Sequence, residues 1–430
     1  MSRRKNRRGA RDGYVNLPAR LGGASTLLGA GTYERSFPFN PALLTSLYRE
    51  SWIAKRIIDM PGEDMTRGWY TLPLEEKQME ELRALESRHD IRREITDGIR
   101  WARLYGGAVA LMVIDGHEGF LAEPLDPDTV MPGSFCGLLV RDRLGVTPSP
   151  ELEDDLNDPD FGYPMYYDLQ AEAGAPGDRA FLRVHHSRVL RFTGRDLPRA
   201  EEAAEQYWGA SELEHIWEEL QKRNATSANI AQLVFQANIT TLRMGDFGEI
   251  LAMGTDQQRR RVLEALEQEN ALRTSFGLQL LSAGDTMENH PYSFAGLSQV
   301  YEAFMLDMAG AAGIPATRLF GRSPQGMNAT GESDLKNYYE LITAMQERHL
   351  RPALEKLLPV MAVSLWGEMP EAPEISFPSL MPVSPPEEAE VQAKQAETLA
   401  CLTRAGLMTP QEARARLTDL GILRPGPDSG

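Results

Sequence analysis

The feature that most constrains this chain is a nineteen-residue interruption between two helical patterns. It spans Gly313–Gly331, reads GIPATRLFGRSPQGMNATG, and contains four glycines and two prolines. Segments of this length without regular structure are uncommon inside compact domains and are usually functional. The segment holds no histidine, cysteine, lysine or carboxylate. We therefore expect it to act as a shaped backbone and not as an acid, a base or a nucleophile.

Length and composition favour a soluble, cytoplasmic chain of several parts. The 430 residues suffice for two or three domains, and a hydrophobic share of 42% is adequate for ordinary cores. No apolar run approaches the length of a membrane span, and no apolar stretch follows the basic N-terminus as in a secretory signal. Cys136 and Cys401 are too few and too far apart for a disulfide framework or a zinc site.

Charge is distributed unevenly along the chain. The net charge is −17, although the first eleven residues carry six arginine and lysine side chains. An acidic body is not typical of a tight nucleic-acid binder, which neutralises phosphates with lysine and arginine. For the basic arm we favour a solubilising tail and keep contact with nucleic acid or an acidic partner as the alternative.

Helical periodicity dominates residues 40 to 104. Asn40-Pro41 is typical of a cap followed by the first helical residue, and an apolar stripe continues from there until Pro61, where we expect the helix to end. Two further helices are predicted over Glu75–Arg88 and Ile91–Leu104.

Strand patterns follow, so the first two hundred residues predict helices and then an antiparallel sheet. The run AVALMVID, residues 108–115, indicates a buried strand. Thr147–Asp160 is acidic and contains prolines, as surface loops do. Further strands are predicted over Phe120–Leu125, Gly137–Arg141, Met165–Leu169 and Arg183–Phe192.

The second half returns to helices around a small insertion. A long helix is predicted over Gly209–Ala237, and its small, neutral second half suits packing on more than one side. The insertion Asn238–Pro291 pairs strand patterns ITTLRM and FGLQLL with a helix over Asp256–Leu272. Further helices are predicted over Leu297–Ala312, over Glu332–Trp366 with a kink at Pro352, and over two short C-terminal stretches, the last starting at Thr409-Pro410.

The sequence contains no recognisable catalytic pattern, so we expect no enzyme activity, cofactor or metal. The sequence has no phosphate-binding Gly-x-x-x-x-Gly-Lys, no dinucleotide-binding Gly-x-Gly-x-x-Gly at a helix start and no His-Glu-x-x-His. Adjacent strand residues face opposite sides, so His185 and His186 are predicted to be structural or capping and not joint metal ligands. Ser211 is predicted to start a helix, because its surroundings lack the second glycine of a nucleophile elbow. Arg259–Arg261 is interpreted as a solvated helix face, with an interaction surface as the alternative.

Several blocks, in the expected order, resemble the portal proteins of tailed bacteriophages. The blocks are YRESWIAKRIIDMPGEDMTRGW, FGYPMYYDL, VHHSRVLRFTGRDLP, GASELEHIWEEL and GIPATRLFGRSPQGMNATGESDLKNYY. They cover most of the chain from Pro41 to Leu358. More narrowly, they are similar to the branch whose N-terminal region is also described as anti-CBASS-protein-like.

The resemblance implies an α+β fold, an elongated portal-type protomer with a mixed helix and antiparallel-sheet wing. It divides the chain into a flexible basic arm (1–40), the first part of the wing (41–208), stem helix 1 (209–237), a small α/β clip (238–293), stem helix 2 (294–312), a tunnel-loop segment (313–331), a long kinked wing or spine helix with the rest of the wing (332–385) and a short helical crown with the C-terminal tail (386–430). The tunnel loop itself is placed at Arg322, Ser323, Pro324, Gln325, Gly326, Met327 and Asn328.

The function implied by the resemblance is mechanical. A homo-oligomeric ring, usually of twelve subunits, occupies one capsid vertex of the virion after assembly in the bacterial cytoplasm. Double-stranded DNA passes through it during packaging and ejection, and the terminase large subunit, head-tail adaptor proteins and the major capsid or scaffold proteins are its partners. No membrane is involved. The alternatives are a phosphodiesterase that acts on cyclic nucleotides of host defence, for which only His185/His186-Ser187 approaches the two His-x-Thr/Ser motifs needed, and another structural adaptor of the virion.

Overall fold

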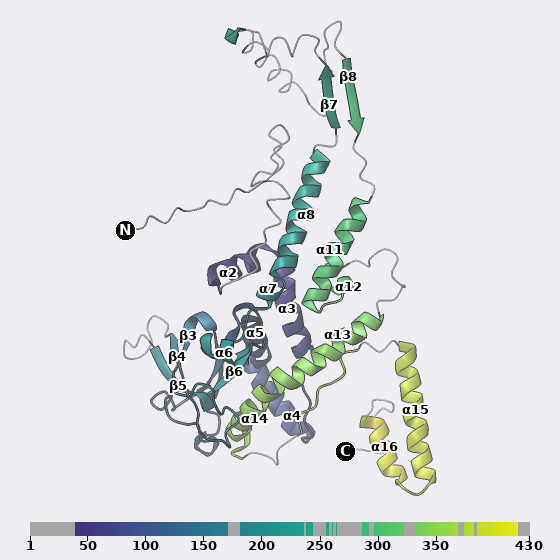
Figure 1. Ribbon diagram of the computed structural model, residues 1–430. Coiled ribbons are helices and arrows are strands. Elements are labelled where there is room, and N and C mark those ends of the chain that lie inside the picture. Colours follow the sequence, from purple (N-terminus) through teal and green to yellow (C-terminus); the bar gives the residue numbers. More distant parts are fainter. Residues whose placement is uncertain are drawn as a thin grey trace, which may run out of the picture. The chain divides into compact units, whose positions relative to one another are not determined.

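The structure is a computed structural model in which helices and small antiparallel sheets form two compact units (Figure 1). One unit consists of Met1–Ile57 and Ala210–Gly331, and the other of Ile58–Gly209 and Glu332–Gly430. The α+β class expected from the sequence is confirmed. None of the helices in the described part of the chain is long and apolar enough to cross a membrane. The described residues are 39–170, 181–235, 238–243, 255–257, 260, 264, 286–291, 296–321, 332–368, 374–381 and 385–419.

The first helical stripe is divided into two helices, α2 (Pro41–Glu50) and α3 (Trp52–Arg67). The predicted cap is confirmed, because the Asn40 side chain accepts a hydrogen bond from the Leu43 backbone N–H at 3.1 Å. The prediction that the helix ends at Pro61 is wrong, since Pro61 lies inside α3.

Long-range contacts explain why α3 continues beyond its proline. The last turn of α3 is buried at Asp64, Met65 and Thr66. The Tyr338 hydroxyl donates to the Asp64 carboxylate at 2.7 Å, and the Gln346 amide donates to the Met65 carbonyl at 2.7 Å. These contacts offset the backbone hydrogen bond that a proline removes.

Helices α4 (Glu76–Arg88) and α5 (Ile91–Tyr105) form where the sequence predicts them. Helix α5 packs against strands through a buried face that includes Ile91, Ile95 and Ile99. Gly98 lies on this face because the Phe192 ring approaches its backbone closely; a β-carbon there would lie 2.7 Å from the ring.

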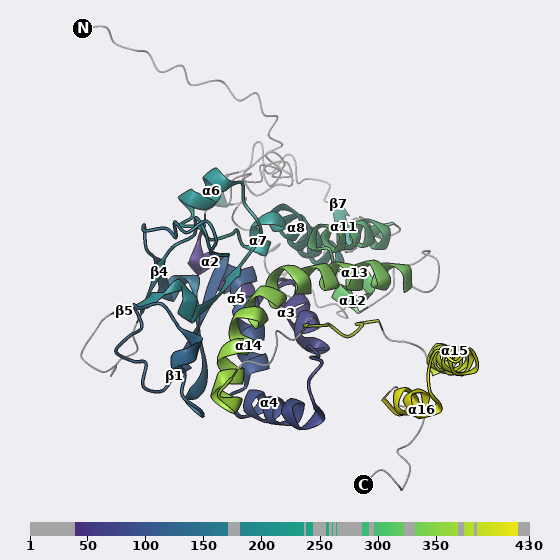
Figure 2. The same ribbon diagram turned by 90° about the horizontal axis from the view of Figure 1, so that it is seen from below.

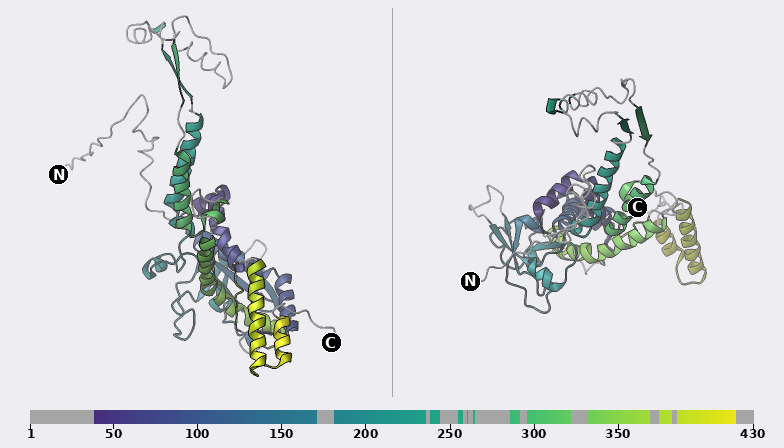
Figure 3. Two further views of the ribbon diagram at one scale, coloured as in Figure 1. Left: turned by 90° about the vertical axis from the view of Figure 1, so that its right-hand side faces the viewer. Right: turned by 45° about the horizontal axis from the view of Figure 1, so that its top comes forward.

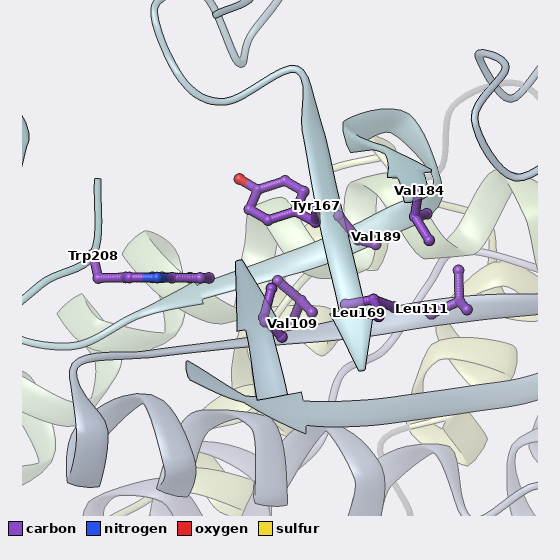
Figure 4. Close-up of a cluster of buried hydrophobic side chains, with 8 residues drawn as sticks. Val109, Leu111, Tyr167, Leu169, Val184, Val189 and Trp208 are labelled. Carbon is purple, nitrogen blue, oxygen red and sulfur yellow. The ribbon is translucent and has the colours of Figure 1, made fainter. Parts of the chain in front are cut away.

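Two antiparallel three-stranded sheets follow in the second unit, and their side chains share a core (Figure 4). The first sheet has the order β2-β1-β6 and the second the order β3-β4-β5. Val109, Leu111 and Val189 from the first sheet meet Val146, Tyr167, Leu169 and Val184 from the second, and Trp208 closes the cluster. The strands are β1 (Gly107–Ile114), β2 (Phe135–Asp142), β3 (Val146–Pro148), β4 (Tyr166–Gln170), β5 (Phe181–His185) and β6 (Val189–Thr193).

Two strand predictions differ from the structure. Phe120–Leu125 is not a strand; among its backbone contacts is a hydrogen bond from His185 N–H to the Leu121 carbonyl at 2.9 Å. Arg183–Phe192 is not continuous, because the 3-10 turn η3 (His186–Arg188) separates β5 from β6. The two strands consequently belong to different sheets. Short turns η1 (Pro127–Thr129) and η2 (Arg143–Gly145) connect the other strands, and α6 (Arg199–Ala204) follows β6.

The long helix predicted over Gly209–Ala237 begins with a separate turn. Helix α7 (Glu212–His215) is capped by Ser211, as predicted, and α8 (Trp217–Phe235) follows after Ile216. In the insertion, β7 (Asn238–Arg243) pairs with β8 (Thr286–Pro291), a strand that the sequence did not predict. The predicted strand FGLQLL and most of the predicted helix 256–272, including Arg259 and Arg261, lie outside the described residues.

The predicted kink near Pro352 takes the form of a π-turn. Helix α13 (Glu332–Met345) passes into the π-turn η4 (Gln346–Leu350) and then into α14 (Arg351–Trp366), as Figure 2 shows. Pro352 lies in the first turn of α14, where its missing N–H costs least. The C-terminal helices α15 (Pro385–Arg404) and α16 (Pro410–Asp419) pack against each other (Figure 3).

Candidate functional site

The predicted tunnel loop, Arg322 to Asn328, lies outside the described residues, so its assignment stays a prediction. The structure does describe the chain that leads into it. Helix α11 (Leu297–Ala312) ends at Gly313, and a short helix α12 (Ala316–Phe320) follows before Gly321. The expected interruption therefore begins with a helical turn, which corrects the prediction that all of Gly313–Gly331 is irregular.

Both helix ends depend on left-handed glycines. Gly313 has a φ of 64° and Gly321 a φ of 69°, a region that residues with a β-carbon rarely adopt. The Ile314 N–H bonds to the Ala309 carbonyl at 3.1 Å, and the Ile314 side chain is buried. This arrangement satisfies end-of-helix carbonyls and turns the chain sharply at a fixed point.

Helix α12 is held in place by the start of α3, which belongs to the same unit. The Arg56 guanidinium donates to the Leu319 carbonyl at 2.9 Å. The Trp52 and Phe320 rings meet edge to face with their centroids 6.1 Å apart, and Leu319 is fully buried. Trp52 and Arg56 were not predicted as supports of this segment, because they lie more than 260 residues away and no local pattern links them to it.

Helices α8 and α11 lie side by side in this unit (Figures 1 and 3). Arg223 on α8 donates to the Tyr301 hydroxyl on α11 at 2.8 Å. Its guanidinium also lies within 6 Å of the Trp52 and Tyr301 rings, where a cation interacts favourably with an aromatic face. A cavity of about 350 Å³ next to this contact is lined by residues that include Lys222 and Phe304.

The second half of α8 and most of α11 lack charged residues. Residues 224–235 of α8 include no charged residue, and α11 carries only Glu302 and Asp307. Among the described residues of α11, Met305, Met308 and Ala309 are buried, whereas Val300 is 49% exposed. A helix that is apolar on most sides is usually covered on most sides. The α8–α11 pair is therefore a candidate surface for contact with another protein chain.

A second group of functional-looking side chains surrounds the histidine pair. The imidazole of His186 lies between two carboxylates, with Nε2 3.0 Å from Glu153 and Nδ1 3.0 Å from Asp160. Lys356 on α14 donates to the same Asp160 carboxylate at 3.0 Å and to the His186 carbonyl at 2.9 Å. Both ring nitrogens of His186 thus lie within hydrogen-bonding distance of a carboxylate.

Electrostatics in this cluster follow from burial and from these contacts. Burial works against ionisation of Asp160, but the hydrogen bond from His186 and the charge of Lys356 outweigh it and hold the pKa of Asp160 well below its usual range. Burial, reinforced by the neighbouring charge of His186, lowers the pKa of His185 from 6.5 to about 4. His185 is thus neutral at pH 7, and its Nδ1 accepts the Ser187 backbone N–H at 3.2 Å.

The predicted capping role of His185 is confirmed, but the predicted ring directions are wrong. The two imidazole centroids lie 4.3 Å apart, because β5 ends at His185 and His186 begins a 3-10 turn. Glu153, His185 and His186 could bring ligand atoms within 4.8 Å of one another. However, a neutral His185 whose Nδ1 accepts a hydrogen bond carries its proton on Nε2, the nitrogen that a metal would need. This argues against Glu153, His185 and His186 as joint metal ligands. Asp158, Asp160 and His186 also bring ligand atoms within 4.8 Å of one another, but Lys356 already pairs with Asp160 there.

Comparison with known proteins places the chain in a family. A family model described as "Phage portal protein" matches residues 43–401. The chain belongs to the phage portal protein family. Its fold is also that of solved chains from the neck of an empty GTA particle computed with C6 symmetry and from the virion of a native gene transfer agent (GTA) particle. The neck chain has a TM-score of 0.51 and 17% identity, and the match covers 94% of this chain and 100% of that one. The virion chain has a TM-score of 0.50 and 17% identity, and the match covers 90% of this chain and 95% of that one.

Relatives by sequence carry different names. The chain is 30% identical over 394 residues to the anti-CBASS protein Acb1 of Caulobacter sp. (strain RHG1), which covers 89% of this chain and 61% of that protein. It is 27% identical over 416 residues to an uncharacterized protein of Haemophilus influenzae (strain ATCC 51907 / DSM 11121 / KW20 / Rd), covering 96% of this chain and 90% of that one. The chain thus spans about three fifths of the length of the Caulobacter Acb1 relative.

Proposed function

We propose that this portal-family protein forms a ring of identical copies at one vertex of a phage capsid and acts as the channel for DNA. The observation that carries the proposal is the neutral, half-exposed α8–α11 pair in a chain of this family. Two such helices from each copy, packed between those of its neighbours, would complete the cover that the single chain leaves open.

The location and copy number are inferred from the solved chains of the same fold. Those chains belong to the neck and the virion of gene transfer agent particles, so we place this protein in the virion, at the junction of head and tail. The C6 symmetry of the neck structure is compatible with six or twelve copies, and twelve is the number that the family resemblance implies. The ring would also receive the terminase large subunit and head-tail adaptor proteins.

The channel itself would work by shape and charge. The net charge of −17 is repeated in every copy, and a ring of acidic bodies repels the phosphate backbone and lets DNA slide. The segment Arg322–Asn328 leaves α12 from a point fixed by Arg56 and Trp52, which suits a loop that meets DNA mechanically. Hydrolysis of ATP for packaging would belong to a partner protein, and we propose no enzymatic activity for this chain.

The positions of His185 and His186 do not support the phosphodiesterase alternative. His185 is buried and uses Nδ1 to cap its own turn, and His186 is held between two carboxylates. Both rings are buried, and three of their four nitrogens contact other protein groups, which leaves little access for a bound substrate.

Shortening the tunnel loop tests the channel role. We expect deletion of Ser323–Asn328 to leave ring assembly intact and to reduce the yield of DNA-filled heads in a packaging reaction. Deletion of an equal number of residues from the N-terminal arm, 12–17, is the matched control and should leave the yield near that of the unaltered protein. Loss of the ring in the loop variant, or unchanged packaging, would show that the loop has a different role.

A further inference from the structure

A closed ring of identical copies needs two different surfaces on each copy that complement each other. The second unit carries such a pair, one rich in arginine and one rich in carboxylates, at sites that the neutral α8–α11 pair does not include. This inference rests on the proposed ring and identifies a contact within it.

The first surface is a cavity of about 710 Å³ beside α4 and the start of α5, called here the arginine pocket. Its floor is formed by Trp69, Tyr70 and Glu86. The Glu86 carboxylate accepts hydrogen bonds from the Trp69 indole at 3.0 Å and from the Tyr70 hydroxyl at 2.6 Å. Burial raises the pKa of Glu86 although both hydrogen bonds oppose it, and Trp69 adopts a left-handed φ of 55°. A hydrogen-bonded aromatic floor with a strained residue is a pre-organised feature.

The rim of the arginine pocket is positively charged. Arg83, Arg92 and Arg93 line it and are exposed. Arg93 reaches Asp97 only at 3.9 Å, a distance typical of a weak surface pair. Asp90 is the exposed carboxylate among the lining residues, so arginines outnumber acids at the rim. The pocket thus combines aromatic surface with a cationic border and suits an acidic segment that carries an apolar side chain.

The second surface is the segment Glu151–Asp160, reading ELEDDLNDPD and called here the acidic loop. Six of its ten residues are acidic, yet its tip carries Leu156, which is 80% exposed. Asp154 and Asp155 precede this leucine directly and are exposed. A largely exposed leucine that follows two carboxylates complements an aromatic pocket with an arginine rim.

The acidic loop is held in a defined shape. At its base, Glu153 and Asp160 each lie 3.0 Å from a ring nitrogen of His186, and Lys356 pairs with Asp160. Near its tip, the Asp155 carboxylate accepts the Asn157 backbone N–H at 2.9 Å. A loop that is ordered before binding loses less entropy when it docks. The contacts of His186 and Lys356 with Glu153 and Asp160 therefore anchor the acidic loop.

The two surfaces of one copy occupy different parts of the second unit. Helix α4, which carries Arg83 and Glu86, and the β3-β4-β5 sheet, into which the acidic loop leads, lie on opposite sides of α14 in the views of Figures 1 and 2. We propose that the acidic loop of one copy docks in the arginine pocket of the next copy in the ring. Leu156 then covers the half-buried Trp69, while Asp154 and Asp155 face the arginines.

Charge reversal and its compensation test this contact. The pocket variant is Arg83→Glu with Arg93→Glu, the loop variant is Asp154→Lys with Leu156→Ser, and a third protein combines Arg83→Glu, Arg93→Glu and Asp154→Lys. Rings are counted by negative-stain imaging and mass photometry across a dilution series at low salt. We expect the pocket and loop variants to need at least about tenfold more protein for the same ring fraction. The combined variant should recover part of that loss, which a purely structural role of these residues would not allow.

Matched controls separate the contact from general charge effects. Arg88→Glu on α4 and Asp128→Lys in η1 change exposed charges outside both surfaces, and these variants should assemble like the unaltered protein. Circular dichroism melts establish that each variant is folded. If a charge variant does not fold, ring assembly by the single variant Leu156→Ser tests the contact instead, because so exposed a side chain contributes little to the stability of the fold.

Each remaining outcome is decisive. If the unaltered protein forms rings and the variants form them equally well, the contact is refuted while the proposed function stands. If the variants assemble normally but lose binding of double-stranded DNA, the arginine pocket serves nucleic acid and the inference is wrong. If the unaltered protein forms no ring, both proposals fail together.

Discussion

Acidification should destabilise the second unit through His185. Burial and the charge of His186 lower the pKa of His185 from 6.5 to about 4. Between these two values the unfolded chain binds a proton that the folded chain does not, so stability falls as the pH drops through 6.5 toward 4. Above pH 6.5 this contribution to stability is fully present.

The size of the effect follows from the gap between the two pKa values. At pH 5, a group with these folded and unfolded pKa values contributes about 2 kcal/mol less to the free energy of unfolding than at pH 8, since each pKa unit corresponds to about 1.4 kcal/mol. Water near Asp160 and Lys356, which are 31% and 29% exposed, screens the cluster. We therefore expect a loss of about 1–2 kcal/mol from His185 alone.

The variant His185→Asn isolates this contribution. Asparagine is a good capping residue and can still accept the Ser187 N–H, but it does not titrate. Urea unfolding of both proteins at pH 8 and pH 5, at one protein concentration, should show the unaltered protein losing about 1–2 kcal/mol more than the variant. Equal losses in the two proteins would refute the reasoning, because the other histidines are common to both.

Two further substitutions test the packing and the capping described above. Gly107→Ala places a β-carbon 2.1 Å from the Trp208 ring and should lower the free energy of unfolding by about 2–3 kcal/mol. The control Gly119→Ala, whose β-carbon meets nothing within 4 Å, should change the free energy of unfolding little. Similar melting temperatures for the two variants would contradict the close approach of Trp208 to Gly107. Asn40→Ala removes the cap of α2 and should lower the free energy of unfolding in denaturant by about 1 kcal/mol, while Asn40→Asp should retain most of the stability. Equal losses in the two variants would mean that the hydrogen bond to the Leu43 N–H contributes nothing to stability.

The sequence predicted best those elements that local signals define. The Asn40-Pro41 start, the Thr409-Pro410 start and the bounds of α4, α5 and α11 agree with the structure within about one residue, because caps and amphipathic stripes act over one or two turns.

The misses depend on contacts that no local window contains. Pro61 remains inside α3 because Tyr338 and Gln346, nearly 300 residues away, hold the turn that follows it. The break between β5 and β6 reflects a change of sheet, which an unbroken apolar pattern does not reveal. The candidate site shows the same contrast between local and long-range features. The turn at Gly313 is predicted by a glycine that follows a helical pattern, whereas no local pattern predicts the support of this segment by Arg56.

The mass of the assembled protein tests the central claim most directly. Mass photometry or native mass spectrometry of the purified full chain should find a ring, and twelve copies of 47.9 kDa give about 575 kDa. A different closed ring would change the copy number and keep the channel. A single species at 47.9 kDa across all protein and salt concentrations would contradict the account, because a lone chain cannot enclose DNA.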